Sequence, residues 1–183
     1  MPELLSAELI ALRERTAALA RGPLAALRDD ASLTDAERGA RVRAASKEAG
    51  LYGLTQRDDT PALALLVARE TLAIHGVSML RGLFGAGGGV LAAVGEPLRS
   101  THLLPMLAGD KVAGFAITEP RDTPLPTHAT VDGDDLVVTG RKSYVTGGAD
   151  ADFLTALVDV DGLGPSMVVI DTDRPGVRVT RRF

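Results

Sequence analysis

Cysteine and tryptophan are both absent from this sequence of 183 residues. The lack of cysteine excludes disulfides, thiolate nucleophiles and cysteine-based metal or iron–sulfur sites, and it is typical of a reducing cytoplasm. Histidine is scarce too. His75, His102 and His128 lie far apart, and none has a second ligand at metal-binding spacing. We therefore expect a cytoplasmic protein without a metal site.

Aromatic residues make up only 3% of the sequence, and the formal net charge at pH 7 is -4. Proteins that bind nucleic acids use basic side chains on the phosphates and, for single strands, aromatic side chains that stack on the bases. A chain with neither surplus is not expected to bind nucleic acid. Hydrophobic residues form 45% of the sequence, which is enough for a globular core.

Long hydrophobic runs are also lacking, since no apolar stretch approaches the roughly 20 residues of a transmembrane helix. The N-terminal stretch MPELLSAELIALRERT carries charges throughout, unlike the apolar centre of a secretory signal peptide. The sequence therefore predicts neither a membrane span nor a signal peptide.

Apolar residues recur at intervals of three and four up to about residue 107, which predicts helices. Breaks are expected at Gly22-Pro23, at 50–59 and at 85–89. Three helix starts are marked by typical pairs of residues: a capping box at Thr34 and Glu37, an N-cap at Thr60-Pro61 and a start at Glu96-Pro97.

From Lys111 onward the apolar period changes to two, with β-branched runs separated by turn residues. The pairs Asp132-Gly133 and Asp161-Gly162 lie between apolar runs and predict hairpin turns. We therefore predict an α+β fold. An N-terminal α-helical domain over 1–110 would be followed by a small antiparallel β-barrel or sandwich domain over 111–183.

Residues 114–120 read GFAITEP, an apolar run that ends in polar residues. In a strand, Phe115 and Ile117 share one face, and Ala116 and Thr118 share the other. The small face that carries Thr118 could take an aromatic ring flat against it. The same pattern also fits a half-buried strand with a threonine at its end.

Residues 140–148 read GRKSYVTGG, in which Tyr144, Val145 and Thr146 precede a Gly-Gly turn. Hydroxyls and bare backbone N–H groups at the end of such a strand suit a planar polar ligand. A strand that simply ends in a turn is the alternative. Lys142 is interpreted as a solvated strand residue.

These two motifs, in this order and separated by a hairpin, resemble the middle domain of acyl-CoA dehydrogenases. That family reads aromatic-x-aliphatic-Thr-Glu-Pro and then Asn-Gly-x-Lys-x-Trp-Ile-Thr/Ser-Asn, with Tyr144 here in place of the usual Trp. The resemblance implies an FAD-dependent oxidoreductase of fatty acid metabolism that desaturates an acyl-CoA substrate at its α,β bond. It also implies that the chain works in a homo- or hetero-oligomer.

The same resemblance implies which residues contact the cofactor. The Thr118 hydroxyl would bond the pyrimidine portion of the flavin, and Thr146 would reach N5, the atom that receives the hydride. The full set of flavin contacts implied in this way is Phe115, Ile117, Thr118, Tyr144, Val145 and Thr146.

The loop after Glu119-Pro120 departs from the family pattern. The family has Gly-x-Gly-Ser-Asp there, which meets the flavin pyrophosphate and the pantetheine of the thioester. Residues 121–126 instead read RDTPLP, with two prolines and no serine. Thr123 is the substrate-binding candidate that this loop retains.

No catalytic residue is predicted within these 183 residues. The family's general base is a glutamate of a third, helical domain, and we expect the sequence to hold only the first two domains. Glu70 and Glu96 lie in helical patterns and Glu119 in a turn, so none is expected to replace that base. The chain alone is therefore expected to be inactive.

Two other functions stay open beside the dehydrogenase. Flavin-dependent monooxygenases resemble the same family and need no thioester base, and a binding or assembly subunit could retain the scaffold without catalysis. A nucleotide-binding glycine loop is not expected, because the G-x-G-x-x-A match at 87–92 lies between helical segments and not in a βαβ unit.

Overall fold

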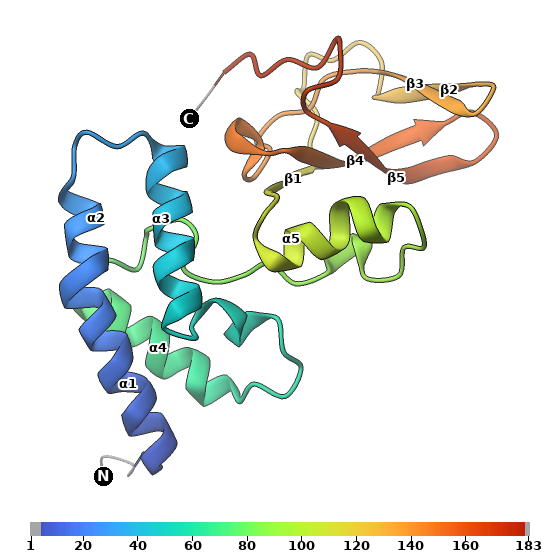
Figure 1. Cartoon of the computed structure of the whole chain (residues 1–183). Coiled ribbons are helices and arrows are strands. Elements are labelled where there is room, and N and C mark those ends of the chain that lie inside the picture. Colours follow the sequence, from blue (N-terminus) through green and yellow to red (C-terminus); the bar gives the residue numbers. More distant parts are fainter. Residues whose placement is uncertain (1–4, 182–183) are drawn as a thin grey trace. The chain divides into compact units, whose positions relative to one another are not determined.

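The computed structural model describes residues 5–181, and its helices come before its strands (Figure 1). The chain divides into two compact units between Gly88 and Gly89. Helices fill the first unit, and a sheet dominates the second. The predicted α+β class is confirmed. None of the helices within the described range is both long and apolar enough to cross a membrane.

The first unit packs its helices around one apolar cluster. Its elements are α1 (Ala7–Leu19), α2 (Ala25–Asp29), α3 (Asp35–Glu48), the 3-10 turn η2 (Tyr52–Thr55) and α4 (Ala62–Ile74). Leu24, Val42, Leu51 and Leu72 meet in this cluster and are fully buried. In α1 the buried positions Leu12, Thr16 and Leu19 follow the spacing of four and three that predicted the helix.

The predicted break at Gly22-Pro23 is wrong. Residues Ala20–Leu24 form a π-helical segment, η1, that joins α1 to α2 with Pro23 inside it. Proline has no N–H to donate, and its ring clashes with the carbonyl one α-helical turn before it. A π-helical bulge widens the turn, so the chain passes the proline without ending the helix.

The capping box at the start of α3 is present as predicted. The Glu37 N–H donates to Thr34 Oγ1 at 3.2 Å, and the Thr34 N–H donates to Glu37 Oε2 at 2.9 Å. At α4 the N-cap is Pro61 and not Thr60, whose hydroxyl is buried and has no hydrogen-bond partner among residues 5–181. That prediction was one residue off.

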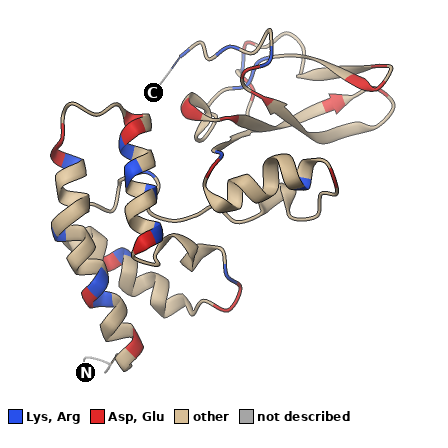
Figure 2. Ribbon diagram, in the orientation of Figure 1, with Lys and Arg blue, Asp and Glu red and all other residues tan. Residues whose placement is uncertain are grey.

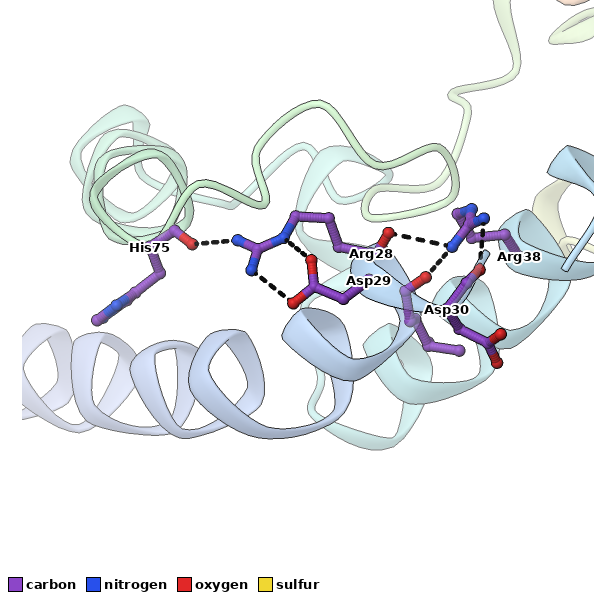
Figure 3. A network of polar contacts seen from close by, with 6 residues as sticks. Arg28, Asp29, Asp30, Arg38 and His75 are labelled. Carbon is purple, nitrogen blue, oxygen red and sulfur yellow. Dashed lines mark hydrogen bonds and ion pairs between the residues drawn. The ribbon is translucent and has the colours of Figure 1, made fainter. Parts of the chain in front are cut away.

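Two arginines close the carboxyl ends of α2 and α4 (Figure 3). The Arg38 guanidinium donates to the carbonyls of Leu27, Arg28 and Asp30, where α2 ends. Arg28 donates to the carbonyl of His75, the C-cap of α4, at 3.3 Å. These carbonyls have no partner within their own helices, so the guanidinium groups satisfy acceptors that would otherwise need water.

The second unit opens with short helical segments and continues into a five-stranded sheet. The helical segments are η3 (Gly89–Leu91), η4 (Arg99–Leu103) and α5 (Leu104–Ala108). The strands are β1 (Ala113–Ala116), β2 (His128–Asp132), β3 (Asp135–Thr139), β4 (Phe153–Val160) and β5 (Gly164–Asp171), with the 3-10 turn η5 (Gly148–Asp150) before β4.

The sheet is mixed, which corrects the prediction of a purely antiparallel domain. Strand β4 pairs antiparallel with β5 over its whole length. Its other edge pairs in parallel with β1 at residues 153–156 and with β2 at residues 159–160. Strands β1 and β2 therefore lie one after the other along the same edge of β4.

Both predicted hairpin turns are present. Gly133 connects β2 to β3 with φ 62°, and Gly162 connects β4 to β5 with φ 78°. Each glycine adopts a left-handed backbone that other residues rarely take, which explains the Asp-Gly pairs in the sequence. The hairpin formed by β2 and β3 has Asp132 directly opposite Asp135.

The change from helix to strand lies between α5 and β1, whereas the compact units divide some twenty residues earlier. Leu103 and Met106 explain the difference, because they share one buried cluster with Phe153 of β4. Helices η4 and α5 therefore belong to the same compact unit as the sheet. The predicted boundary near residue 110 had placed them in the helical domain.

Candidate functional site

The two motifs singled out in the sequence pair with each other. The Phe115 N–H donates to the Thr146 carbonyl at 3.1 Å, and the Ser143 N–H donates to the Thr118 carbonyl at 2.8 Å. Phe115 and Thr146 form an antiparallel bridge. Segment 143–146 thus runs antiparallel to segment 115–118, with Tyr144 opposite Ile117.

The pairing is irregular at Tyr144. A regular antiparallel ladder repeats its hydrogen bonds every two residues, but here the two bonds lie three residues apart on each segment. Tyr144 falls between them with φ 54°, a left-handed conformation that is uncommon for a bulky residue. The side chain of Tyr144 is 74% exposed at this point. The irregular backbone therefore leaves an aromatic ring on the surface beside Ile117.

The exposed face of this pair of segments differs from the one expected. Ala116 is fully buried and shares a core cluster with Ala156 and Val158, so no ring can rest on its face. Phe115 and Ile117 on the other face are 48% and 40% exposed. A planar ligand would have to lie against these two larger side chains.

The two threonines at the site have hydroxyls that are available to a ligand. Thr118 and Thr146 are both exposed, and neither hydroxyl forms a hydrogen bond with another residue in the described part of the chain. Residues directly opposite in an antiparallel pair share a face, so the Thr146 side chain lies on the same side as Phe115. Val145 instead packs against the core, and only its backbone could meet a ligand.

An ion pair that the sequence reading missed joins the two motifs. Lys142 Nζ lies 2.7 Å from Glu119 Oε1, and the same oxygen accepts the Thr127 N–H at 2.8 Å. Lys142 Nζ also donates to the Ile117 carbonyl at 3.2 Å. The side chain of Lys142 is only 11% exposed, so its interpretation as a solvated strand residue is wrong.

The same contacts fix the protonation state of Glu119. The hydrogen bond from Lys142, followed by that from the Thr127 N–H, lowers the pKa of Glu119 to about 2. A carboxylate with so low a pKa holds protons poorly near neutral pH and is a weak general base. Glu119 is therefore a positioning residue. Opposite charges within the two motifs were the only sequence signal for this contact.

Comparison with known proteins supports the resemblance, although no family model matches the chain. It is 34% identical over 99 residues to acyl-CoA dehydrogenase FadE29 of Mycobacterium tuberculosis, which covers 49% of this chain and 26% of that protein. It is 29% identical over 90 residues to mitochondrial isobutyryl-CoA dehydrogenase of Dictyostelium discoideum, covering 45% of this chain and 22% of the relative.

Solved structures extend the similarity to nearly the whole chain. A Mycobacterium smegmatis structure described as an acyl-CoA dehydrogenase is 27% identical with a TM-score of 0.64, covering 98% of this chain and 51% of that one. By these matches the chain is similar to acyl-CoA dehydrogenases. Glutaryl-CoA dehydrogenase from Mycobacterium smegmatis shares the fold at 21% identity and a TM-score of 0.69, covering 94% of this chain and 47% of that one.

The chain spans about a quarter of the length of these curated acyl-CoA dehydrogenase relatives in its matched region. It spans about half of the length of the solved structures. The activity of a whole acyl-CoA dehydrogenase therefore does not transfer directly to this chain.

The loop that departs from the acyl-CoA dehydrogenase pattern borders a shallow pocket of about 250 Å³. Thr123 and Leu125 line it from the loop, and Arg141 lines it from the second motif. Arg141 forms an ion pair with Asp122 at 2.6 Å, which ties this loop to the second motif. The Thr123 hydroxyl is buried without a partner among the described residues, so a ligand would reach it only after the loop moves.

Among residues 5–181, no group of three or more His, Asp or Glu side chains is arranged so that it could hold a metal ion. His102 instead contacts Asp171, with 2.9 Å between Nε2 and Oδ1, and its ring meets Phe153 edge to face at 4.8 Å. This pair joins η4 to β5, beside the buried cluster that contains Leu103 and Phe153.

Proposed function

We propose that segments 115–118 and 143–146 bind FAD, and that the chain serves an acyl-CoA dehydrogenase-like flavoprotein that desaturates an acyl thioester at its α,β bond. The observation that carries this proposal is the antiparallel pairing of the two motifs. The pairing brings the exposed side chains of Phe115 and Ile117 and the Thr146 hydroxyl together on one face, and it leaves Thr118, another exposed threonine, at the end of the first segment. An apolar platform with a few polar groups is what a flavin ring requires.

The related glutaryl-CoA dehydrogenase structure is a complex with FADH2, which supports FAD as the cofactor. When bound, the flavin would supply the acceptor for the β-hydrogen of the substrate, which leaves as hydride. In our proposal Phe115, Ile117 and Tyr144 pack on the ring, and Thr118 hydrogen-bonds its pyrimidine edge. Thr146 donates a hydrogen bond on the Phe115 side, where it would stabilise negative charge on the reduced ring.

Desaturation also requires removal of the α-proton of the thioester. Glu119 is unsuited to that task because Lys142 holds its carboxylate in place and lowers its pKa to about 2. Glu96 is engaged as well, since its carboxylate accepts hydrogen bonds from the N–H and hydroxyl of Ser100. We propose that the base comes from a segment outside these 183 residues, in the same polypeptide or in a partner.

The names of the relatives support the proposed substrate class. Their names include several acyl-CoA dehydrogenases and a 3-(aryl)acrylate reductase, which suggests chemistry between a saturated and an unsaturated carbon pair. The loop that carries Thr123 and lines this pocket lacks the glycines of the family pattern. We therefore propose that the substrate is an acyl-CoA or related small molecule, and that its pantetheine portion is bound in a different way from that in the family.

FAD titration of the purified full chain, followed by the quenching of flavin fluorescence, tests the proposal. Thr118→Val and Thr146→Val should each weaken binding about two- to tenfold, the value of one hydrogen bond. Thr130→Val is the matched control, because Thr130 is an exposed strand threonine outside the site. Unchanged affinity in a Thr118→Val/Thr146→Val double variant would contradict the proposed site, as would equal loss in the control.

A further inference from the structure

A groove with basic side chains lies on the surface of the first unit, between α1 and the end of α4. Its volume is about 310 Å³, at the lower end of the range for small-molecule sites. Seven residues line it: Arg13, Glu14 and Ala17 of α1, Arg21 of η1, and Thr71, Ile74 and His75 at the end of α4. Arg13, Ala17 and Arg21 are spaced by four, so they share one face, and the two arginines are about 12 Å apart along the helix axis.

The two arginines of the groove are not engaged within the chain. Among residues 5–181, neither the Arg13 nor the Arg21 guanidinium forms an ion pair or a hydrogen bond. Arg28, by contrast, pairs with Asp29 and donates to the end of α4. Figure 2 shows the basic positions of α1 in blue and its acidic positions in red. The two arginines outweigh Glu14, the acidic residue of the lining, so the groove favours an anion.

His75 adds a polar ring near the Arg21 end of the groove. Its carbonyl accepts the hydrogen bond from Arg28 at 3.3 Å, and Arg28 follows Arg21 by about two helical turns. Figure 3 shows the His75 ring turned away from the Arg28 guanidinium. Neither nitrogen of this ring has a hydrogen-bond partner in the described part of the chain. The ring is therefore available to share an anionic group with Arg21.

Apolar side chains complete the lining. Ile74 is 74% exposed, so covering it with a ligand would remove apolar surface from water. Ala17 lies midway between the two arginines, and its methyl group leaves room for a ligand. Thr71 offers no free donor, because its hydroxyl donates to the Val67 carbonyl at 2.7 Å. These features suit a molecule with an anionic head and an apolar body.

We propose that this groove binds a small organic acid, with its carboxylate on Arg21 and His75 and its hydrocarbon chain on Ala17 and Ile74. A guanidinium presents N–H groups that match both oxygens of a carboxylate. The head lies at the Arg21 end because the charges of neighbouring Arg13 and Glu14 offset each other at the opposite end. The site uses residues of the first unit alone and does not depend on the flavin proposal, whose segments belong to the second unit.

Calorimetric titration of the full chain with octanoate tests the site. Arg21→Gln should weaken binding about tenfold, because a charged hydrogen bond to the carboxylate is lost. Arg15→Gln, on α1 but outside the lining, is the matched control and should change little. Ala17→Leu should abolish binding by filling the groove, whereas Ala18→Leu, at an exposed position outside the lining, should not. Thermal unfolding without octanoate checks that each variant is folded.

Two further ligands separate charge from chain. Octanol has the chain without the charge and acetate has the charge without the chain, so each should bind about tenfold or more weakly than octanoate. Backbone amide NMR should show octanoate-induced shifts at Ala17 and His75.

Several results would overturn the proposal. These are no binding at millimolar octanoate, equal loss in Arg21→Gln and Arg15→Gln, and shifts confined to 115–118 and 143–146. Sedimentation of the chain with phosphatidylglycerol vesicles, without octanoate binding, would instead assign the surface to a membrane.

Discussion

Glu119 and Lys142 lie 23 residues apart in sequence, and their side chains meet at 2.7 Å. One belongs to the GFAITEP motif and the other to GRKSYVTGG. The same Glu119 oxygen also holds the Thr127 N–H, just before β2 begins. A single carboxylate therefore ties together the two segments of the proposed flavin site and the start of β2, which lies between them in the sequence.

Removing the cation should loosen this arrangement. Lys142→Met leaves the mostly buried Glu119 carboxylate without its charged partner, so we expect unfolding free energy to fall by about 1–3 kcal/mol. FAD affinity should fall with it, because segment 143–146 loses an anchor. Urea denaturation and FAD titration measure the two effects. Lys111→Met, which removes a lysine without an ion pair in the described structure, should change neither.

The Glu119 pKa also predicts how stability depends on pH. Its pKa is about 2 in the folded chain against an ordinary value of 4.5, so the ionised form stabilises the folded state above pH 4.5. That contribution should disappear as pH falls from about 4.5 to about 2. Urea denaturation across this range should show a smaller loss of stability in Glu119→Gln than in the parent. Equal pH dependence in both chains would contradict the assignment.

Features set by neighbouring residues were predictable from the sequence. The Thr34 and Glu37 capping box and the glycine turns at Gly133 and Gly162 formed as expected. Each depends on backbone conformations that a few adjacent residues determine. The change from a period of three or four to a period of two likewise located the passage from helix to strand near residue 110.

Features set by distant residues were not predictable. Periodicity showed that Ala116 and Ile117 occupy opposite faces of a strand, but only the packing of Ala156 and Val158 decides that the face of Ala116 is buried. The parallel pairing of β4 with β1 and β2 joins segments without a connecting turn. The contact between Glu119 and Lys142 depends on that same long-range pairing.

Gly114 is a point of close approach within the β module. A Cβ added there would lie 2.7 Å from Leu154 Cδ2 and 3.1 Å from the Gly148 Cα, and the second atom belongs to the backbone. Gly114→Ala should therefore lower the unfolding free energy by about 1–3 kcal/mol, as overpacking does. Gly95→Ala is the control, because nothing lies within 4 Å of its added Cβ. Thermal unfolding of both variants measures the difference.

His102 and Asp171 should show energetic coupling. Their side chains meet at 2.9 Å and are 9% and 31% exposed, so solvent screens the contact only in part. In a double-mutant cycle of His102→Gln and Asp171→Asn, we expect an interaction energy of about 1 kcal/mol in unfolding free energy. A value near zero would mean that η4 is held to the sheet by its apolar contacts with Phe153 alone.

Tyr144 should separate stability from cofactor binding. Its φ of 54° is unfavourable for a large side chain, whereas asparagine tolerates that conformation. The ring is 74% exposed, so its removal costs little packing within the chain. Tyr144→Asn should therefore keep the unfolding free energy within about 1 kcal/mol of the parent or raise it, while FAD binding weakens several-fold because a stacking surface is lost.

Chemical denaturation and FAD titration on the same Tyr144→Asn sample distinguish these effects. Tyr144→Phe is the matched control, because it keeps the ring and the backbone conformation and should bind FAD nearly as the parent does. If Tyr144→Asn bound FAD normally, the ring would lie outside the cofactor site. If Tyr144→Asn unfolded as easily as Gly114→Ala, the tyrosine ring would stabilise the fold. Its exposure would then not be explained by a strained backbone that presents the ring to a ligand.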